Sequence, residues 1–330
     1  MQLKILKAED IRRALTMPLA IQAVEEAFIH FSSGKAIIPL RTSITPDRSA
    51  GTTLFMPAYL PSLGALGAKV ISIFPGNLPR GLPTIHALVL LLDPATGVPR
   101  GLLDGSALTA IRTGAASGVA TKYLSRPEAA VVAVFGAGIQ GRSQLEAVCA
   151  VRPIRKAFIW DPLPERALAF SREMASRGNP FPRDIRVADS PGDALNAADI
   201  ICTATTSSTP VFNDADVKPG THINAIGSYE PHVQEIPAET VRRAKVVVDS
   251  IEAALAETGD LIIPLKAGHF TRGMIHGEIG QVASGEIAGR ESKDEVTLFK
   301  SVGLAVQDMA VGHLALRAAD ELGLGRTIEV

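Results

Sequence analysis

Cysteine is scarce in this sequence, which has only Cys149 and Cys202 among its 330 residues. Cys149 falls in an apolar segment with helical periodicity, and Cys202 falls in an apolar segment with strand character. We therefore expect two buried thiols rather than a disulfide or a metal-binding pair. No metal site is predicted.

An excess of one charge and long apolar runs are also missing. Lysine and arginine number 33 and aspartate and glutamate 34, which argues against a basic surface for nucleic acid. The longest apolar runs, such as residues 87–92, are too short to span a membrane. The first ten residues carry acids where a signal peptide has its apolar core. We expect a cytoplasmic protein that binds neither nucleic acid nor membrane.

What the sequence does contain is a glycine-rich turn after an apolar segment, residues 131–135. Gly136, Gly138 and Gly141 form the pattern G-x-G-x-x-G. In dinucleotide-binding proteins these glycines permit a tight turn, approach of the backbone to the pyrophosphate, and close packing of the following helix. A second apolar segment ends at Asp161, about twenty residues beyond the loop, where a ribose-binding carboxylate is expected. Loop and acid together predict a dinucleotide site.

Two patterns of secondary structure divide the chain. Residues 37–103 read as short extended segments separated by proline and glycine, which predicts a mostly antiparallel sheet. From residue 131 to 249, strand-like and helical segments alternate, which predicts a parallel, doubly wound sheet. Further helices are expected at residues 107–124 with Ser106 as the cap, at 275–288, and within 298–322.

Charged side chains interrupt apolar or small-residue segments at three positions, Arg41, Lys69 and Arg112. Strand alternation puts Lys69 on the same face as Ile71 and Ile73. A purely structural explanation is that each cation extends to solvent or pairs with a carboxylate, and the pattern alone favours this for Arg41. The functional interpretation is that the three cations bind the carboxylate of a small substrate.

Together with the motifs given below, these residues make the sequence resemble the ornithine cyclodeaminase/mu-crystallin family over nearly its full length. The resemblance implies a Rossmann domain, residues 118–303, inserted into an α+β domain, residues 1–117 and 304–330, that binds substrate and forms a homodimer. The shared motifs are Pro39–Thr42, Met56–Tyr59, Gly67–Lys69, Asp104–Ser106, Thr109–Thr113, Gly136–Gly141, Val217–Gly227, Asp249–Ser250 and Gly259–Asp260.

The resemblance also implies roles for individual residues. Lys69 and Arg112 match reaction-centre positions, and the implied substrate contacts are Arg41, Lys69, Thr84, Arg112 and Tyr229. His86 has no role that the resemblance transfers. The implied cofactor contacts are Thr84, Arg112, Thr113, Gly136, Ala137, Gly138, Ile139, Gln140, Gly141, Asp161, Thr203, Asn224, Ala225 and Ile226.

Two positions depart from the cyclodeaminases, which carry an aspartate in place of Tyr229 and a glutamate in place of Met56. Oxidising an amine requires a base that removes its proton, and a tyrosine with the usual pKa near 10 is a poor base at neutral pH. Glu230 would substitute only if its loop rotated. Ketimine reductases similar to mu-crystallin also lack the aspartate. We therefore predict an NAD(P)H-dependent reductase of cyclic ketimines, Δ1-pyrroline-2-carboxylate or Δ1-piperideine-2-carboxylate.

Several alternatives stay open at this point. Asp161 favours NAD(H), because its carboxylate would repel the 2′-phosphate of NADP(H). NADP(H) stays possible, because Arg166 lies downstream and relatives with similar loops accept NADPH. The proton donor is either Lys69 or a water held by Lys69 and Thr84. The alternative enzymes are an ornithine cyclodeaminase or an alanine dehydrogenase-type deaminase. The alternative of another class is a non-catalytic, NAD(P)-dependent binding protein.

Overall fold

The computed structural model describes residues 1–39, 41–47 and 51–330, and the chain forms two compact units. The first unit comprises Met1–Arg112 and Leu304–Val330, and the second comprises Thr113–Gly303. The division falls within helix α3 (Gly105–Leu124), the same helix in which the sequence-based boundary lies. The second unit is therefore an insertion into the first along the chain.

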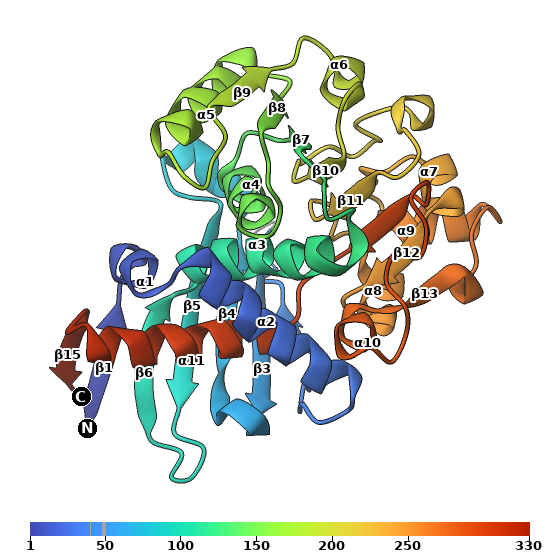
Figure 1. Ribbon diagram of the computed structural model, residues 1–330. Coiled ribbons are helices and arrows are strands. Elements are labelled where there is room, and N and C mark those ends of the chain that lie inside the picture. Colours follow the sequence, from blue (N-terminus) through green and yellow to red (C-terminus); the bar gives the residue numbers. More distant parts are fainter. Residues whose placement is uncertain (40, 48–50) are drawn as a thin grey trace. The chain divides into compact units, whose positions relative to one another are not determined.

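A seven-stranded sheet forms the first unit, in the order β15-β1-β6-β5-β4-β3-β2 (Figure 1). The pairs from β6 to β2 and the β1–β15 pair are antiparallel, and β1 pairs in parallel with β6. The predicted, mostly antiparallel sheet is confirmed. Its strands are β1 (Gln2–Leu6), β2 (Thr42–Ile44), β3 (Thr52–Leu60), β4 (Ala65–Ile73), β5 (Ile85–Leu92), β6 (Pro99–Asp104) and β15 (Arg326–Glu329), with the short 3-10 helices η1 (Pro61–Leu63) and η2 (Pro75–Arg80).

Helices cover one face of this sheet. They are α1 (Ala8–Ala14), α2 (Met17–Ser32) and α11 (Ala305–Glu321). Helix α11 contacts β3, β4, β5 and α2, and Figure 1 shows α2 and α11 crossing the strands. Met56, Lys69 and Val89 lie side by side in the strand register and are buried on the covered face. The next row places Phe55 and Leu88 on the opposite face, where both are exposed.

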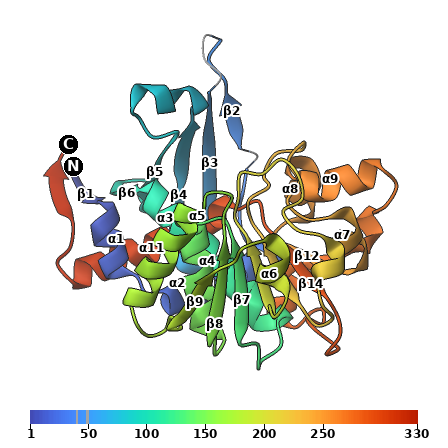
Figure 2. The ribbon, with the colours of Figure 1, turned by 90° about the horizontal axis from the view of Figure 1, so that it is seen from above.

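The second unit contains an eight-stranded parallel sheet in the order β13-β12-β14-β11-β10-β7-β8-β9. Figure 2 shows β7, β8 and β9 side by side. The chain builds outward from β7 to β9 and then returns to place β10 on the other side of β7, so the strand order reverses between β7 and β10. The strands are β7 (Val131–Phe135), β8 (Lys156–Trp160), β9 (Asp184–Val187), β10 (Ile200–Thr203), β11 (His222–Ala225), β12 (Lys245–Val248), β13 (Ile275–Glu278) and β14 (Thr297–Lys300).

Both faces of this parallel sheet are buried. Along β7, Ala133 and Phe135 pack into one apolar cluster while Val132 and Val134 pack into another, which is typical of a doubly wound sheet. That prediction is confirmed. The helices of this unit, besides α3, are α4 (Ile139–Val151), α5 (Pro164–Ser176), α6 (Pro191–Leu195), α7 (Ala238–Arg243), α8 (Ile251–Glu257), α9 (Gly259–Lys266) and α10 (Ile279–Ser284), with the 3-10 helices η3 (Asp214–Asp216) and η4 (Arg272–Met274).

Two local predictions were wrong, and a third is confirmed. Helix α3 begins at Gly105, and its first turn is capped by Asp104, whose Oδ1 accepts from the Ala107 N–H at 2.8 Å, so Ser106 is not the cap. The segment 275–288 is not one helix, because its first four residues form strand β13 beside β12. The helix expected within 298–322 is confirmed as α11; it is preceded by β14, and Asp249 accepts the N–H groups of Val302 and Gly303 between the two elements.

Two of the absences in the sequence have structural counterparts. Cys149 and Cys202 are free and buried, and burial raises the pKa of each thiol to about 12. Among the helices of the described ranges, none is both long and apolar enough to cross a membrane.

Candidate active site

The first unit carries a buried charge cluster centred on Asp308 of helix α11. Asp308 Oδ2 accepts from Lys69 Nζ at 2.6 Å, and its Oδ1 accepts from Arg112 Nε at 3.2 Å. Lys69 is 1% exposed, Arg112 7% and Asp308 0%. Because one carboxylate balances two cations, this cluster keeps a net positive charge away from water. Such a cluster suits an anionic ligand.

Arg112 is held on two sides. Its Nη1 donates to Gln307 Oε1 at 2.8 Å, in addition to the bond from Nε to Asp308. The same Gln307 oxygen accepts from the Leu304 N–H at 3.0 Å. Both partners of that oxygen are donors, which fixes the orientation of the Gln307 amide. The guanidinium plane is therefore fixed before any ligand arrives.

Burial dominates the chemistry of Lys69. The pKa of this lysine falls from 10.5 to about 8, with burial as the largest cause; the nearby Arg112 and Arg41 act in the same direction, and Asp308 acts in the opposite direction. Removing water penalises the charged form, and a neighbouring cation has the same effect. Lys69 thus remains mainly protonated at neutral pH but loses its proton in the mildly alkaline range.

The remaining sequence-predicted residues of this unit are less buried than Lys69 and Arg112. Arg41 precedes β2 and is coupled to Lys69 through its charge, while Leu40 of the same motif lies outside the described residues. Thr84 is partly buried just before β5, and its carbonyl oxygen accepts from the Phe74 N–H at 2.8 Å. His86 is exposed, on the sheet face opposite Lys69.

In the second unit, the glycine loop fits a dinucleotide pyrophosphate. Gly136 has a φ of +98°, a conformation that favours glycine, and a Cβ at Gly141 would collide with the Gly136 carbonyl oxygen. A Cβ at Gly138 would meet nothing within 4 Å, so the backbone there is open to a ligand. Helix α4 starts directly afterwards at Ile139, whose side chain is exposed, whereas Ala137 within the loop is buried. The N–H groups of the first helical turn are available to an anion.

Asp161 lies where a ribose-binding acid is expected, directly after β8. Its Oδ2 accepts from the Ala137 N–H at 2.9 Å and its Oδ1 from the Leu163 N–H at 3.0 Å. Each carboxylate oxygen has two lone pairs, so Asp161 can hold the loop and still accept from a ribose hydroxyl. Gln140 and Thr113 are also in this unit, and the Thr113 carbonyl accepts from Gln144.

The predicted cofactor residues on β10 and β11 have inward-facing side chains. Thr203 is buried and donates to Glu235 Oε2 at 2.9 Å. Asn224 is buried and donates to Thr121 Oγ1 at 3.0 Å. Ala225 is buried as well, whereas Ile226 is partly exposed. Any contact of Thr203 or Asn224 with a cofactor would therefore come from the backbone.

Tyr229 follows β11 and is 46% exposed. Partial burial and the adjacent Glu230 raise its pKa above the usual value of 10. The phenol therefore stays protonated at neutral pH, which makes Tyr229 an even poorer base than its residue type implies.

Sequence reasoning missed four buried groups that organise these sites, namely Asp308, Gln307, Glu235 and Lys300. Lys300 Nζ donates to Asp260 at 2.9 Å, and both side chains are 0% exposed. A usable signal was present, because Lys300 and Asp308 interrupt apolar segments in the same way as Lys69 does. The criterion that identified Lys69 would have identified them too.

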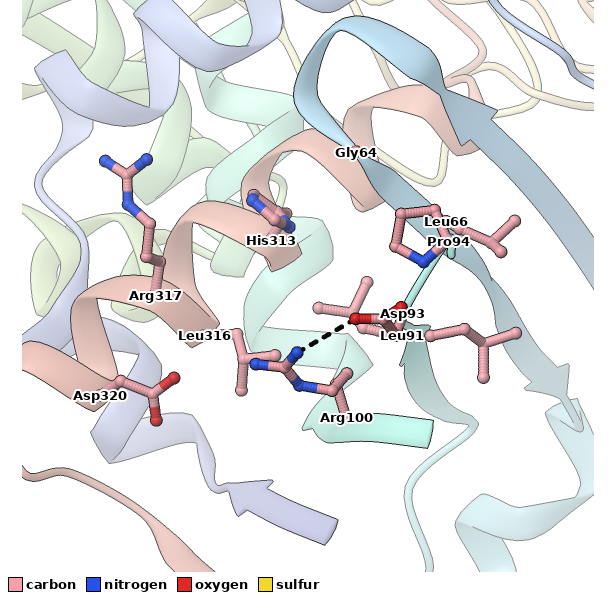
Figure 3. Close-up of a pocket in the computed structure, with 11 residues that line it drawn as sticks. Gly64, Leu66, Leu91, Asp93, Pro94, Arg100, His313, Leu316, Arg317 and Asp320 are labelled. Carbon is pink, nitrogen blue, oxygen red and sulfur yellow. Dashed lines mark hydrogen bonds and ion pairs between the residues drawn. The ribbon is translucent and has the colours of Figure 1, made fainter. Parts of the chain in front are cut away.

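A separate cavity in the first unit, of about 130 Å³, lies between α11 and the β5–β6 hairpin (Figure 3). Its lining includes the apolar residues Leu66 and Leu316 and the polar residues His313 and Arg317. Arg100 is paired with Asp93 at 3.2 Å. None of the predicted site residues lines this cavity, so we do not place the active site there.

We predict that Asp308→Asn lowers the free energy of unfolding by about 3 kcal/mol or more, because it leaves two buried cations without their counter-charge. Denaturant unfolding measures this loss. Asp320→Asn, on the exposed part of the same helix, removes only the surface pair with Lys4 and should cost about 1 kcal/mol or less. Adding Lys69→Met to Asp308→Asn should restore part of the loss. Equal costs for the two aspartates would contradict the bridging role of Asp308.

Known proteins are similar to this chain over nearly its whole length. The sequence profile of the ornithine cyclodeaminase/mu-crystallin family matches residues 1–319. A Δ1-pyrroline-2-carboxylate reductase of Bacillus cereus is 44% identical over 326 residues, covering 98% of this chain and 99% of the relative.

Two solved structures are similar over the whole chain. The Thermococcus litoralis Δ1-pyrroline-2-carboxylate reductase in complex with NADH and L-proline has a TM-score of 0.93 and 43% identity, covering 98% of this chain and 100% of that one. An archaeal alanine dehydrogenase dimer with bound NAD has a TM-score of 0.92 and 36% identity, covering 100% and 99%. The chain belongs to the ornithine cyclodeaminase/mu-crystallin family.

Proposed function

We propose that this protein is an NAD(P)H-dependent reductase of cyclic ketimines, which converts Δ1-pyrroline-2-carboxylate to L-proline or Δ1-piperideine-2-carboxylate to L-pipecolate. The observation that carries the proposal is the net positive cluster of Lys69, Arg112 and Asp308, in a chain that also has a dinucleotide loop. The B. cereus and T. litoralis relatives are named as reductases of the five-membered imine. We infer that the first unit binds substrate and the second binds the dinucleotide.

The substrate carboxylate would bind to the fixed cations. Asp308 and Gln307 occupy Arg112 at Nε and Nη1, which leaves the outer edge of the guanidinium for a charge-assisted contact with a carboxylate. The Lys69 ammonium and Arg41 would neutralise the second oxygen. Because these groups are held in advance, substrate binding would order few additional side chains.

The chemistry asks little of the protein beyond orientation. When bound, the reduced nicotinamide supplies the hydride for the imine carbon. An imine that is already protonated in solution needs no strong acid, so the protonated Tyr229 and the apolar Met56 are tolerated at positions where cyclodeaminases carry acids. Lys69, or a water held by Lys69 and Thr84, would stabilise the bound ion. Amine oxidation, in contrast, would need a base that these positions lack.

The cofactor preference follows from Asp161, whose carboxylate would accept from a ribose 2′-hydroxyl and repel a 2′-phosphate. The T. litoralis relative was solved with NADH. We therefore favour NADH and keep NADPH as the alternative. A cytoplasmic location stays a prediction.

Initial rates test the proposal directly. Both cyclic imino acids are assayed with NADH and with NADPH, beside L-ornithine and L-alanine with NAD. We expect imine reduction to exceed amino-acid oxidation by about a hundredfold or more, since a positioned general base is worth that much. Ammonia release from ornithine at a comparable rate would overturn the reductase. Release from alanine would favour an alanine dehydrogenase, which the 36% identical archaeal enzyme keeps as the second candidate. Binding of NADH without any turnover would favour the non-catalytic alternative.

The pH dependence tests the role of Lys69. Its lowered pKa of about 8 means that the ammonium is lost as the pH rises through that value, so kcat/KM should be constant below it and fall about tenfold per unit above it. Lys69→Arg keeps its charge throughout and should move the decline to higher pH, even if the overall rate is lower. A decline at the same pH in both proteins would assign the titration to the substrate imine instead.

We also propose that the exposed sheet face of the first unit forms a homodimer interface. Phe55 and Leu88 occupy one row of that face and are 39% and 51% exposed. Ile44 of the neighbouring strand β2 pairs with Thr53, so it lies on the same face, and it is 52% exposed. In a monomer these apolar side chains would stay exposed to water, whereas contact with a second copy would bury them. The archaeal alanine dehydrogenase was solved as a dimer.

Introducing a charge on that face should dissociate the dimer. We expect Leu88→Glu to convert a species of twice the 34.7 kDa chain mass into the monomer, measured by sedimentation velocity. Leu322→Glu provides the control, because Leu322 is also apolar and 59% exposed but follows α11 instead of lying on the sheet. A wild-type monomer, or a Leu88→Glu dimer, would contradict the proposed interface.

A further inference from the structure

The second unit contains a buried carboxylate, that of Glu235, which is not among the predicted site residues. Glu235 is 0% exposed and accepts five hydrogen bonds. Its Oε1 accepts from Thr205 N at 2.7 Å and Thr205 Oγ1 at 2.6 Å. Its Oε2 accepts from Thr203 Oγ1 at 2.9 Å, Gly227 N at 2.7 Å and Ser228 N at 3.2 Å.

These donors lie at the carboxyl ends of two neighbouring strands or in the loops that follow them. Thr203 ends β10 and Thr205 follows it, while Gly227 and Ser228 follow β11. One carboxylate therefore links, through hydrogen bonds, the loops at the carboxyl ends of both strands. A Cβ at Gly227 would collide with Glu235 Oε1 and with the Thr205 carbonyl oxygen, so glycine at this position permits the close approach.

The two loops lie where a doubly wound sheet is expected to bind one half of a dinucleotide. In a doubly wound sheet, the dinucleotide binds across the carboxyl ends of the strands where the strand order reverses, and each half of the sheet takes one mononucleotide. The glycine loop after β7 and Asp161 after β8 belong to the first half. Strands β10 and β11 lie on the other side of the reversal, where the nicotinamide mononucleotide would bind.

The carboxylate is itself held rigidly. Asp260 Oδ1 accepts from Glu235 N at 2.7 Å and from Ile236 N at 3.0 Å, and its Oδ2 pairs with Lys300. Burial and Asp260 raise the pKa of Glu235, whereas Lys300 and the bond from Thr205 favour the ionised form. A charge held among this many donors is typical of a group that fixes backbone geometry.

We propose that Glu235 is a positioning residue for the nicotinamide half of the cofactor site, acting through the loops that follow β10 and β11. The inference rests on the proposed function only in taking a nicotinamide dinucleotide as the cofactor. It adds that the two halves of the dinucleotide depend on different residues of this chain, so that one half can be weakened while the other remains.

Two ligands separate binding of the nicotinamide ring from binding of the rest of the dinucleotide in the test. NADH contains the whole dinucleotide, whereas ADP-ribose lacks only the nicotinamide ring. The chain has a single tryptophan, Trp160, in β8 next to Asp161, so energy transfer from Trp160 reports NADH binding without turnover. Calorimetry gives the Kd of ADP-ribose.

We expect Glu235→Gln to raise the Kd of NADH about tenfold or more, since its amide group would face backbone N–H donors, and to change that of ADP-ribose about threefold or less. Thr205→Val, which removes one of the five donors, should shift NADH binding in the same sense but less. This milder variant keeps the test decisive if Glu235→Gln does not fold.

Asp199→Asn is the matched control for structural damage. Asp199 also joins two strands of the sheet, because its Oδ2 accepts from Ala130 N at 2.9 Å and from Val131 N at 3.1 Å. It lies just before β10, however, at the amino ends of the strands. Asp199→Asn should lower Tm while changing neither Kd by more than about threefold.

The outcomes are distinct. Equal weakening of NADH and ADP-ribose in Glu235→Gln and Thr205→Val, or no weakening of either, would overturn the positioning role. A wild-type protein that bound neither NADH nor NADPH would overturn the cofactor assignment together with it. Normal NADH binding without imine reduction would contradict the proposed reaction and leave the role of Glu235 supported by its own binding data.

Discussion

The ion pair between Lys69 and Asp308 is the interaction on which the first unit depends. Its two residues are 239 positions apart in the sequence, and neither charge would be buried on an apolar sheet face without the other. The pair therefore fixes α11, the last helix, against β4 of the N-terminal sheet. The second unit, Thr113–Gly303, lies in the chain between the two segments that this pair joins.

The same pair limits how much charge the cluster can hold. A second carboxylate would stabilise Lys69 and Arg112 but would also cancel the field that a substrate carboxylate needs. One carboxylate shared by two cations is a compromise, because Asp308 offsets only part of the lowering of the Lys69 pKa that burial and the nearby arginines cause. The cations remain under-neutralised, and binding of an anion would relieve that imbalance.

Local patterns in the sequence were sufficient for part of this description. The glycine loop, Asp161 and the buried cations at Lys69 and Arg112 each follow from neighbouring residues, and so do the two kinds of sheet. Partnerships between distant segments could not be predicted in this way. Nothing near Asp308 shows that it meets Lys69, and only the pairing with β12 makes a strand of Ile275–Glu278. Asn224 illustrates a further limit, since its inward orientation depends on Thr121 of another element.

Asp308 and Glu235 solve a similar physical problem in the two units. Apolar packing holds elements together without a preferred direction, so it cannot by itself set the angle of a guanidinium or the course of a loop. A buried carboxylate accepts several directional bonds from segments distant in sequence, and each bond excludes an alternative geometry. Asp308 does this for two side chains and Glu235 for two loops. Because an isolated buried charge is costly, all of these bonds must form together, so the geometry of each cluster is tied to folding itself.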